Sequence, residues 1–544
     1  MKKIILFALS VALYTTVSAQ PMVNLDSYAA GQLATKDLNG TARYVGMGGA
    51  LEALGADLST MSTNPAGIGM FRRSHASVSF GMNIQGEGKN FQNGTKTNAS
   101  FDQVGVVIST RMGATSYLNI GFNFHKSRNF DYVLSAANNA VNGSSLHRQT
   151  YVKMLRGDLD ENSAKNLIHP YRESQLDQLN YRIIDIYQEN PTTKKKEYVE
   201  SISPEAINYM FDRAHTGYIG EYDINLSGNI NNRVYLGLTV GIHDVHYKAY
   251  SEYSENFITP TITTKGNRYE RPYAKYTDDQ EITGTGYDIK IGAIFRPIEE
   301  SPFRFGVSIA TPTWYRLKTR NYTTISDQYG VVDNIKDDVK FALNTPWQFG
   351  ISAGYTIGTQ WALGLSYDFA DYGACDMRSI TSRYYDSWSD TYNTKTESDS
   401  NMKRLTEQTL KGVSTLKAGV EFRADKMLAI RLGYNYVSPM YKSDAVRDQT
   451  IDSPGVYMAS TSDYTNWKDT HRLTAGVGLT FDKFRVDLAY QYSATNGDFY
   501  PYMKELTGTN KDSQGKTFTM TNSAEAVSVK NIRHQLLCTL GYTF

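Results

Sequence analysis

The chain has 544 residues, with 56 basic and 55 acidic side chains, a formal net charge of +1 and a mean hydropathy of -0.44. So balanced a charge excludes a protein that binds nucleic acid through a broad basic surface. Beyond residue 19 no stretch is apolar for the roughly 20 residues of a membrane-spanning helix, which excludes a helical membrane protein. The two cysteines, Cys375 and Cys538, cannot form a paired-cysteine zinc site.

Residues 1–19 have the pattern of a secretory signal peptide. Two lysines precede an apolar core over residues 4–14, and small residues occupy positions 18 and 19. The segment is too short for a transmembrane helix, so it predicts export and a mature chain that begins at Gln20.

Residues 20–74 lack any strand pattern and are rich in glycine and small side chains. Several apolar residues lie among them: Val45, Met47, Leu51, Leu54 and Ile68. A segment of this kind needs a neighbouring structure against which to bury these side chains.

From residue 75 onward, runs in which apolar residues alternate with polar or small ones predict β-strands. In the first run Val78, Phe80 and Met82 share one face. Fourteen such runs occur, at residues 76–85, 104–111, 118–125, 218–230, 234–242, 286–296, 303–309, 340–358, 361–369, 416–423, 428–436, 473–481, 484–492 and 535–544.

The lengths of the connections between these runs alternate. Every even-numbered run leads through a tight turn to the next, whereas most connections from odd-numbered runs are long: residues 131–216, 250–280, 373–412, 437–470 and 493–530. Transmembrane barrels combine short periplasmic turns, longer extracellular loops and an even number of strands. The pattern therefore predicts a 14-stranded antiparallel transmembrane β-barrel in the bacterial outer membrane, with residues 131–216 as a long extracellular insertion.

The two ends of the barrel segment, residues 75–544, add to this interpretation. The last run ends on Phe544, which resembles the C-terminal signal that the barrel insertion machinery recognises. At the other end, residues 20–74 find a place to bury their apolar side chains if they fold into the lumen as a plug. A soluble β-sandwich is the alternative, but its loops need not segregate by length.

Several charged residues fall on the face of the strands that points into the lumen: Asp223, Asp288, Lys290, Arg304, Glu421, Arg431, Arg485 and Asp487. Counting back from the turn at residues 424–426 places Glu421 opposite Arg431, which predicts a lumenal ion pair. One hypothesis is that such a basic group binds a substrate carboxylate. The alternative is that salt bridges join the wall to itself and to the plug.

Histidines and helix signals suggest two further interpretations. His125, His243 and His246 lack metal-ligand spacing. His243 and His246 are also an odd number of residues apart, so on a strand they point to opposite faces, and we expect no metal site.

Ser203 and Pro204 favour the start of a helix over residues 203–211, in which Ile207, Met210 and Phe211 would share a face. Such a helix indicates a loop that is partly helical, with a small core of its own or a groove that captures lipophiles.

Short motifs occur across the mature chain. The most specific is Asn64, Pro65, Ala66 and Gly67 (NPAG), and the others are GMGGA at 46–50, residues 57–59, Thr311 with Pro312, residues 345–347 (TPW) and RLGY at 431–434. Together they resemble the FadL/TodX family of outer-membrane transporters for hydrophobic compounds, with NPAG similar to the family's N-terminal hatch.

The resemblance implies passive uptake of hydrophobic compounds such as long-chain fatty acids. Family members capture the solute at extracellular loops, pass it to an internal pocket and release it sideways beside a kinked third strand, while the hatch blocks direct passage. Gly121, which falls in the third run, is then a candidate for the lateral gate, since a strand glycine often marks a bulge.

The expected partners are a lipophilic small molecule, outer-membrane lipid and the barrel assembly machinery, with no nucleic acid and no cofactor. An outer-membrane receptor for haem or another small ligand is the alternative function. A barrel-embedded lipid hydrolase is a further one, but no nucleophile motif stands in a strand-to-helix context, so we do not expect an enzyme.

Overall fold

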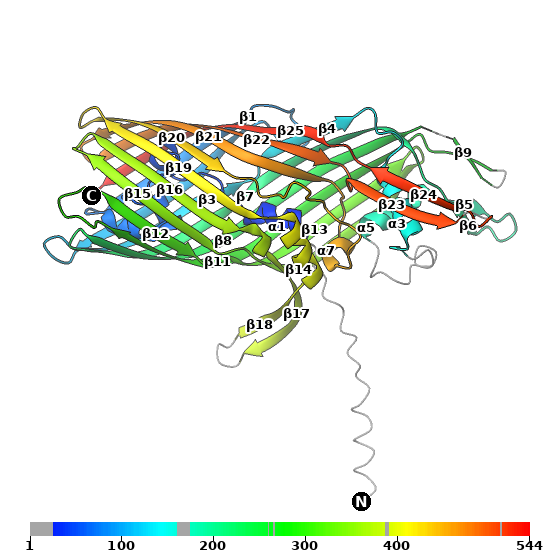
Figure 1. The fold of residues 1–544 in the computed structure, drawn as a ribbon, viewed down its shortest axis with the longest axis horizontal. Helices are drawn as coiled ribbons and strands as arrows, with labels where there is room; N and C mark the ends of the chain where they lie inside the picture. The colour runs from blue at the N-terminus through cyan, green and yellow to red at the C-terminus, as the bar shows by residue number, and fades with distance from the viewer. Residues whose placement is uncertain (1–24, 160–173, 259–260, 265–266, 387–390, 512–513) are drawn as a thin grey trace, which may run out of the picture.

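The computed structural model describes residues 25–159, 174–258, 261–264, 267–386, 391–511 and 514–544; the predicted signal peptide lies outside them. Within these residues fourteen antiparallel strands form a closed barrel, in which β25 pairs with β22 on one side and with β1 on the other (Figure 1). Each of the fourteen runs predicted from the sequence overlaps one strand of this ring, so the predicted fold class is confirmed.

The strands of the ring are β1 (His75–Gln85), β2 (Thr97–Arg111), β3 (Tyr117–Asn129), β7 (Ala206–Ile230), β8 (Val234–Phe257), β11 (Tyr273–Phe295), β12 (Arg304–Ala310), β15 (Gln348–Ile357), β16 (Trp361–Asp371), β19 (Gly412–Arg423), β20 (Leu428–Val437), β21 (Tyr464–Phe481), β22 (Phe484–Tyr500) and β25 (Val527–Thr543). Further strands continue the same sheet: β4 (Tyr132–Asn138), β13 (Trp314–Asp327), β14 (Gly330–Asn344), β17 (Asp376–Asp386) and β18 (Thr391–Ser398). Separate hairpins are β5 (Asp185–Glu189) with β6 (Lys196–Ser201), β9 (Thr261–Thr264) with β10 (Asn267–Glu270), and β23 (Glu505–Lys511) with β24 (Thr517–Ser523).

Short helices occupy the N-terminal segment and the long connections. Those before β1 are α1 (Ser27–Ala34), α2 (Ala42–Gly46), η1 (Leu58–Ser62) and η2 (Pro65–Met70). Those in the connections are α3 (Leu146–Arg156), α5 (Gln175–Ile184), η3 (Tyr372–Ala374), α6 (Ser400–Thr409) and α7 (Pro454–Tyr457). Among the described residues, no helix combines the length and the apolar character needed to cross a membrane.

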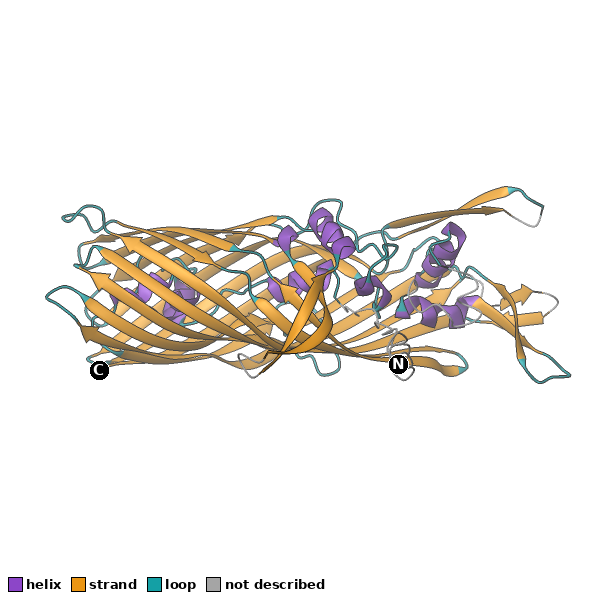
Figure 2. Cartoon of the chain, turned by 90° about the horizontal axis from the view of Figure 1, so that it is seen from below, coloured by secondary structure: helices purple, strands orange, loops and turns teal. Residues whose placement is uncertain are grey.

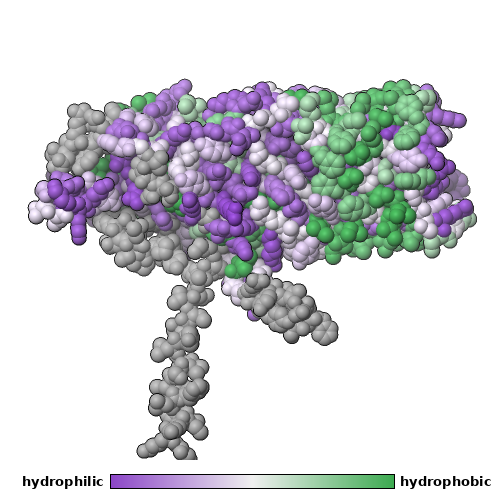
Figure 3. All heavy atoms as spheres, turned by 180° about the vertical axis from the view of Figure 1, so that it is seen from behind, coloured by the Kyte–Doolittle hydropathy of each residue, from purple (hydrophilic) through white to green (hydrophobic). Residues whose placement is uncertain are grey.

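An apolar belt lies at one end of the barrel on the face that Figure 3 shows, and exposed apolar side chains occur on strands around the ring, such as Ile120, Ile351 and Leu488. On β8, for example, Leu236, Leu238 and Val240 are 41–48% exposed. Thr239, which lies between two of them, and His243, which follows them, are fully buried. Strands that turn apolar side chains outward and polar ones inward are typical of a barrel that faces lipid. On the face that Figure 3 shows, the described residues toward the other end are mostly hydrophilic.

The belt lies at the end that carries the C-terminus and the tight turns (Figures 1 and 3). Asn231 and Asn232 have φ angles of 52° and 54° in the turn between β7 and β8, a conformation that asparagine tolerates well in two-residue hairpins. The long connections lie at the other end. The expected segregation of short turns and long loops is therefore confirmed.

The stretch 131–216 differs from the expected insertion. Within this stretch, β4 and the first residues of β7 extend the barrel wall, and β4 pairs with β7 from Tyr132 to Asn138. The helix predicted at 203–211 is wrong, because residues from Ala206 onward form β7, with Met210 exposed and Phe211 buried. Pairing with both β4 and β8 outweighs the local capping signal at Ser203 and Pro204. Helices α3 and α5 make the connection partly helical, as expected.

The N-terminal segment, residues 25–74 (hereafter the hatch), lies inside the barrel (Figure 2). Helix α2 contacts β20, β21 and β22 on one side, and η2 contacts β7, β8 and β11 on the other. Its apolar residues Val45, Met47, Leu51 and Ile68 are fully buried. The lumen thus supplies the surface that these side chains need.

Candidate substrate cavity and the break in the barrel wall

The Asn64–Gly67 motif forms a tight turn against the wall. The side chain of Asn64 caps η2 by accepting the N–H of Ala66 at 3.2 Å, and the carbonyl of Pro65 accepts the hydroxyl of Ser227 at 2.8 Å. A β-carbon at Gly237 on β8 would overlap the backbone of Pro65. Glycine in the wall therefore allows the turn to approach the strands at backbone distance.

Ion pairs join the hatch to the wall at several points: Lys36 with Glu221 at 3.3 Å, Arg43 with Glu421 at 3.1 Å, and Glu52 with Lys417 at 2.6 Å. In each pair the wall residue is almost fully buried. Each wall residue also has a partner on the wall itself: Lys290 for Glu221, Arg431 for Glu421 and Asp368 for Lys417. The hatch therefore completes ion-pair networks that begin in the wall.

Glu421 and Arg431 lie opposite each other on β19 and β20, and the Nε of Arg431 donates to Glu421 Oε2 at 2.7 Å. The Nη1 of Arg431 donates to Asp487 at 2.7 Å, and Arg43 of the hatch reaches the same Glu421 oxygen. Arg431 thus forms ion pairs with two carboxylates of the wall. The contacts favour the interpretation in which salt bridges hold the wall and the hatch together.

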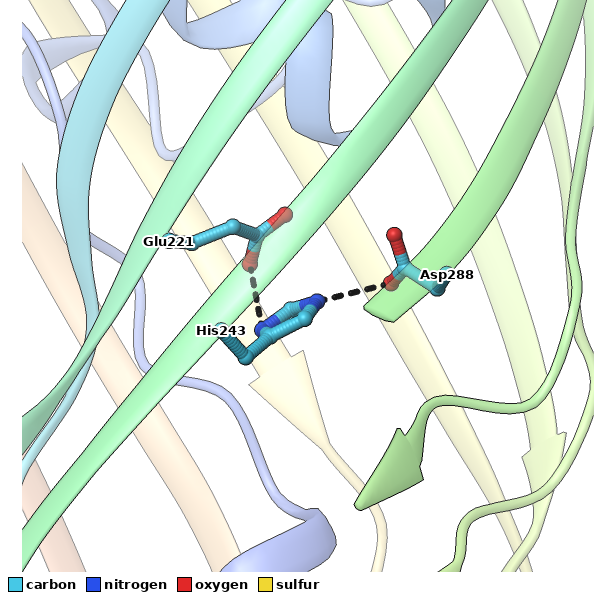
Figure 4. A group of neighbouring side chains, drawn as sticks. All are labelled: Glu221, His243 and Asp288. Atoms are coloured by element: carbon cyan, nitrogen blue, oxygen red, sulfur yellow. Dashed lines mark hydrogen bonds and ion pairs between the residues drawn. The ribbon is translucent and has the colours of Figure 1, made fainter. Parts of the chain in front are cut away.

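A second charged cluster lies on β7, β8 and β11. Glu221, His243 and Asp288 each offer an atom within 4.8 Å of the others, the arrangement of a possible metal site (Figure 4). However, the ammonium group of Lys290 lies 2.8 Å from Glu221, 2.6 Å from Asp288 and 3.1 Å from Asp223. Lys290 therefore already pairs with the carboxylates that a metal ion would need.

The other two candidate histidines do not extend this cluster into a metal site. His125 is buried 3.9 Å from Glu221 but also 3.7 Å from Asp223, distances beyond those of a hydrogen bond. His246 points outward and pairs with Asp244 at 2.8 Å, which agrees with its odd spacing from His243.

Gly121 lies in an unbroken ladder, where it pairs with Val107 of β2. A β-carbon there would overlap the methyl group of Met61 in η1, so the residue makes room for the hatch. The bulge expected at this glycine is therefore absent. Its part in a lateral gate stays a prediction.

The ladder between β2 and β3 does break farther along. Gln103 and His125 are its last pair; beyond them residues 97–101 pair with β1 alone, and Lys126, Arg128 and Asn129 pair with β7 alone. Each side of the break carries a β-bulge, at Asp102 and at Ser127, where one residue has no partner in the register. A bulge bends a strand and ends its pairing.

Aromatic rings line the outer face of the wall next to this ladder break. Neighbouring ring centroids are 4.9–5.8 Å apart along a row of four residues, Phe80, Phe101, Phe124 and Tyr222. Aromatic side chains favour the boundary between lipid and water. The break therefore begins at the edge of the apolar belt.

The hatch fills the ladder break from inside. Asn39 donates to Asp102 Oδ1 and to the carbonyl of Lys126, both at 3.0 Å, and so connects the two sides. Asp37 donates its backbone N–H to the carbonyl of Ser127 at 2.7 Å and accepts the N–H of Asn129 at 2.9 Å. The hatch thus replaces the missing strand for the backbone groups of β3.

A cavity of about 460 Å³ extends from this break to the space beneath the long connections. Its lining includes both polar and apolar side chains, among them Asp37, Ser127, Phe130, His215, Tyr441 and Trp467. This volume is in the range of pockets that enclose a small molecule. In the half of β7 that lies away from the apolar belt, burial together with Arg213 and Arg128 lowers the pKa of His215 to about 3, so the ring is neutral.

Sequence reasoning missed the ladder break and most residues of the cavity. One local signal was present: Asp102 and Gln103 interrupt the alternation with two successive polar residues between Phe101 and Val104, as a bulge requires. The contacts of Asp37 and Asn39 with β3 have no such signal, because about 90 residues separate the partners.

No protein-family model matches the sequence, and no curated protein matches it. Among solved structures, a FadL homologue from Pseudomonas aeruginosa is 10% identical over 94% of this chain and 100% of its own, with a TM-score of 0.47. The Ralstonia pickettii toluene transporter TbuX is 12% identical (93% and 99%, TM-score 0.46), and the P. putida toluene transporter TodX is 11% identical (93% and 99%, TM-score 0.45). These likenesses extend over most of the chain, but the function proposed below rests on the geometry of this protein.

Proposed function

We propose that this protein is a passive outer-membrane channel for hydrophobic compounds. The ligand is captured at the long connections, enters the cavity of about 460 Å³, and leaves sideways between β2 and β3. Exit into lipid suits a hydrophobic solute, which crosses a polar surface layer poorly but enters hydrocarbon readily.

This proposal rests on one observation: the ladder between β2 and β3 is broken, and the hatch fills the break. An open strand edge at the boundary of the apolar belt leaves backbone groups that need other partners. Here Asp37 and Asn39 of the hatch satisfy them, and both residues also line the cavity. Movement of one short segment would therefore connect the cavity to the outside of the wall.

A reversible cross-link between the hatch and the wall tests this route. Asn39→Cys combined with Asp102→Cys replaces two side chains whose polar atoms are 3.0 Å apart, in a protein whose native cysteines are changed to serine. A short bis-methanethiosulfonate reagent joins the two thiols through disulfide bonds. We expect cells with the cross-linked variant to lose uptake of radiolabelled oleate and to regain it after reduction. Cells without the protein set the background.

The possible outcomes separate the parts of the proposal. Undiminished uptake in the fully cross-linked variant contradicts exit through the ladder break and favours passage through the hatch. Equal uptake by cells with and without the wild-type protein contradicts transport of this solute. A parallel arm with haem tests the alternative function, since uptake of haem alone favours a haem receptor.

A further inference from the structure

The outside of the barrel carries a cluster of basic side chains where β11, β13 and β14 lie side by side (Figure 1). Arg316, Lys318 and Arg320 alternate along the outer face of β13, and Lys340 of β14 lies directly opposite Lys318. Residues opposite each other on antiparallel strands have β-carbons about 5 Å apart, so two lysines share one place on the surface. Like charges in this arrangement repel each other, and an anion beside them would offset the repulsion.

A single carboxylate of β14 serves this cluster. Asp338 lies 2.8 Å from the Nζ of Lys318 and 3.6 Å from the Nε of Arg320. Arg316 donates to the backbone carbonyl of the preceding residue at 3.2 Å. Among the residues that the structure describes, neither Arg316 nor Lys340 has a carboxylate within ion-pair distance. Positive charge therefore exceeds negative charge on this part of the surface.

Two carboxylates on the adjoining strands have basic partners of their own. Glu281 of β11, which lies opposite Arg320, pairs with Lys248 of β8 at 3.3 Å. Asp244 of β8 pairs with His246 at 2.8 Å. These carboxylates are thus engaged elsewhere, and the excess of positive charge on β13 and β14 remains.

The cluster begins next to the lipid-facing surface of the barrel. Trp314 precedes Arg316 by two residues on the same face, and its ring centroid lies 5.3 Å from that of Tyr287 on β11. On the other side of Tyr287, Ile289 and Ile291 are 39% and 54% exposed. Two residues of a strand span about 7 Å, which is roughly the depth of the head-group layer beside the hydrocarbon. The cations therefore lie at the level of lipid head groups, and the aromatic pair lies at the boundary.

Other strands carry different side chains at this boundary. The hydroxyl of Tyr434 on β20 lies 2.7 Å from a ring nitrogen of His471 on β21. Tyr490 on β22 and His534 on β25 make the same contact at 2.8 Å. Aromatic pairs of this kind suit a membrane interface in general, whereas the cluster on β13 and β14 adds uncompensated charge.

We infer that Arg316, Lys318 and Lys340 bind the phosphate group of a membrane lipid in the leaflet that borders the long connections. Three cations that approach from two strands match a phosphate, which offers several acceptor oxygens and up to two negative charges. The acyl chains of the same lipid would lie on the exposed isoleucines of β11. This site lies on the outside of the wall and goes beyond the proposed function, which concerns a solute inside the barrel.

Native mass spectrometry of the exported protein in detergent micelles tests this assignment. The probes are diphosphoryl lipid A, the same lipid after removal of its phosphates, and inorganic phosphate. We expect diphosphoryl lipid A to bind the wild type about tenfold more tightly than the dephosphorylated lipid, equivalent to about 1.4 kcal/mol. Equal affinity for the two lipids overturns the inference. An adduct with inorganic phosphate as stable as that with lipid A also overturns it, because the site would then take a free anion and not a lipid.

Matched variants assign the binding to the cluster. The triple variant Arg316→Gln, Lys318→Gln and Lys340→Gln should bind diphosphoryl lipid A as weakly as the wild type binds the dephosphorylated lipid. Lys318→Arg combined with Lys340→Arg keeps the charge and should retain binding.

The control variant removes three exposed lysines at the hairpin of β5 and β6, with Lys194, Lys195 and Lys196 each changed to Gln. It loses as much positive charge as the triple variant, and its affinity for diphosphoryl lipid A should equal that of the wild type. Wild-type affinity in the triple variant, or an equal loss in the control, overturns the inference. Retained heat-modifiable mobility in gels confirms that each variant is folded, and unchanged uptake of oleate by the triple variant separates this site from transport.

Discussion

The side chain of Gln85 at the end of β1 takes the place of a backbone partner for Val133 of β4. Its amide nitrogen donates to the carbonyl of Val133 at 2.8 Å, and its oxygen accepts the N–H of the same residue at 2.9 Å. β1 ends at this residue, whereas β4 continues the wall beyond it. The side chain of Gln85 therefore satisfies both backbone polar groups of Val133, beyond the point where β1 ends.

Replacement of Gln85 by Ala should loosen this part of the wall. Two buried backbone groups of Val133 lose their partners, at a local cost of about 1–3 kcal/mol. Hydrogen exchange at the amide of Val133 should accelerate, as mass spectrometry of peptides from β4 would detect. Gln491→Ala, a change of another buried lumenal glutamine, should leave this peptide unaffected. Equal exchange in Gln85→Ala and the wild type would contradict the bridging role.

The wall glycines permit a comparison between two neighbouring strands. Gly237→Ala places a β-carbon on the backbone of Pro65, whereas the nearest atom to a β-carbon at Gly228 is 4.0 Å away. We expect Gly237→Ala to destabilise the seated hatch by about 1–3 kcal/mol and Gly228→Ala to have little effect. Leakage of a small hydrophilic dye into proteoliposomes measures this, and equal leakage from both variants would refute the close fit.

The terminal aromatic residue should control assembly. Phe544 is 61% exposed, and its backbone N–H donates to the carbonyl of Ser74 at 3.0 Å, where the hatch meets β1. Deletion of Phe544 removes the ring that resembles the insertion signal, so the amount of heat-modifiable protein in the outer membrane should fall. Phe544→Trp retains an aromatic terminus and should assemble normally. Assembly of the deletion variant at the wild-type level would contradict this role.

The half of β7 that lies away from the apolar belt should lose stability in acid because of His215. An unfolded histidine takes up a proton near its ordinary pKa of 6.5, whereas burial beside Arg213 and Arg128 lowers the pKa of folded His215 to about 3. The unfolded state thus binds more protons between these values, and local stability falls as the pH drops from 6.5 to 3. His215→Gln should reduce this loss, measured by limited proteolysis of β7 over that pH range. An identical pH dependence would refute the assignment.

The sequence by itself determined the ring of strands and the side of each strand that faces outward. Alternation is a local property with a period of two, so Leu236, Leu238 and Val240 identify an exposed face without knowledge of any partner strand. The tight turns, the segregation of the long connections and the lumenal position of Glu421 and Arg431 follow from the same counting.

Only the tertiary structure decided where the strands end, where the wall is broken and what fills the break. The helix signal at Ser203 failed because pairing with β4 and β8 extends β7 to Ala206, and such pairing is absent from any local window. The bulge of β3 lies at Ser127 and not at Gly121, since the hatch segment around Asp37 stabilises it from a distance of about 90 residues in the chain. Contacts of this kind depend on which surfaces meet after the barrel closes, and a linear pattern does not contain that information.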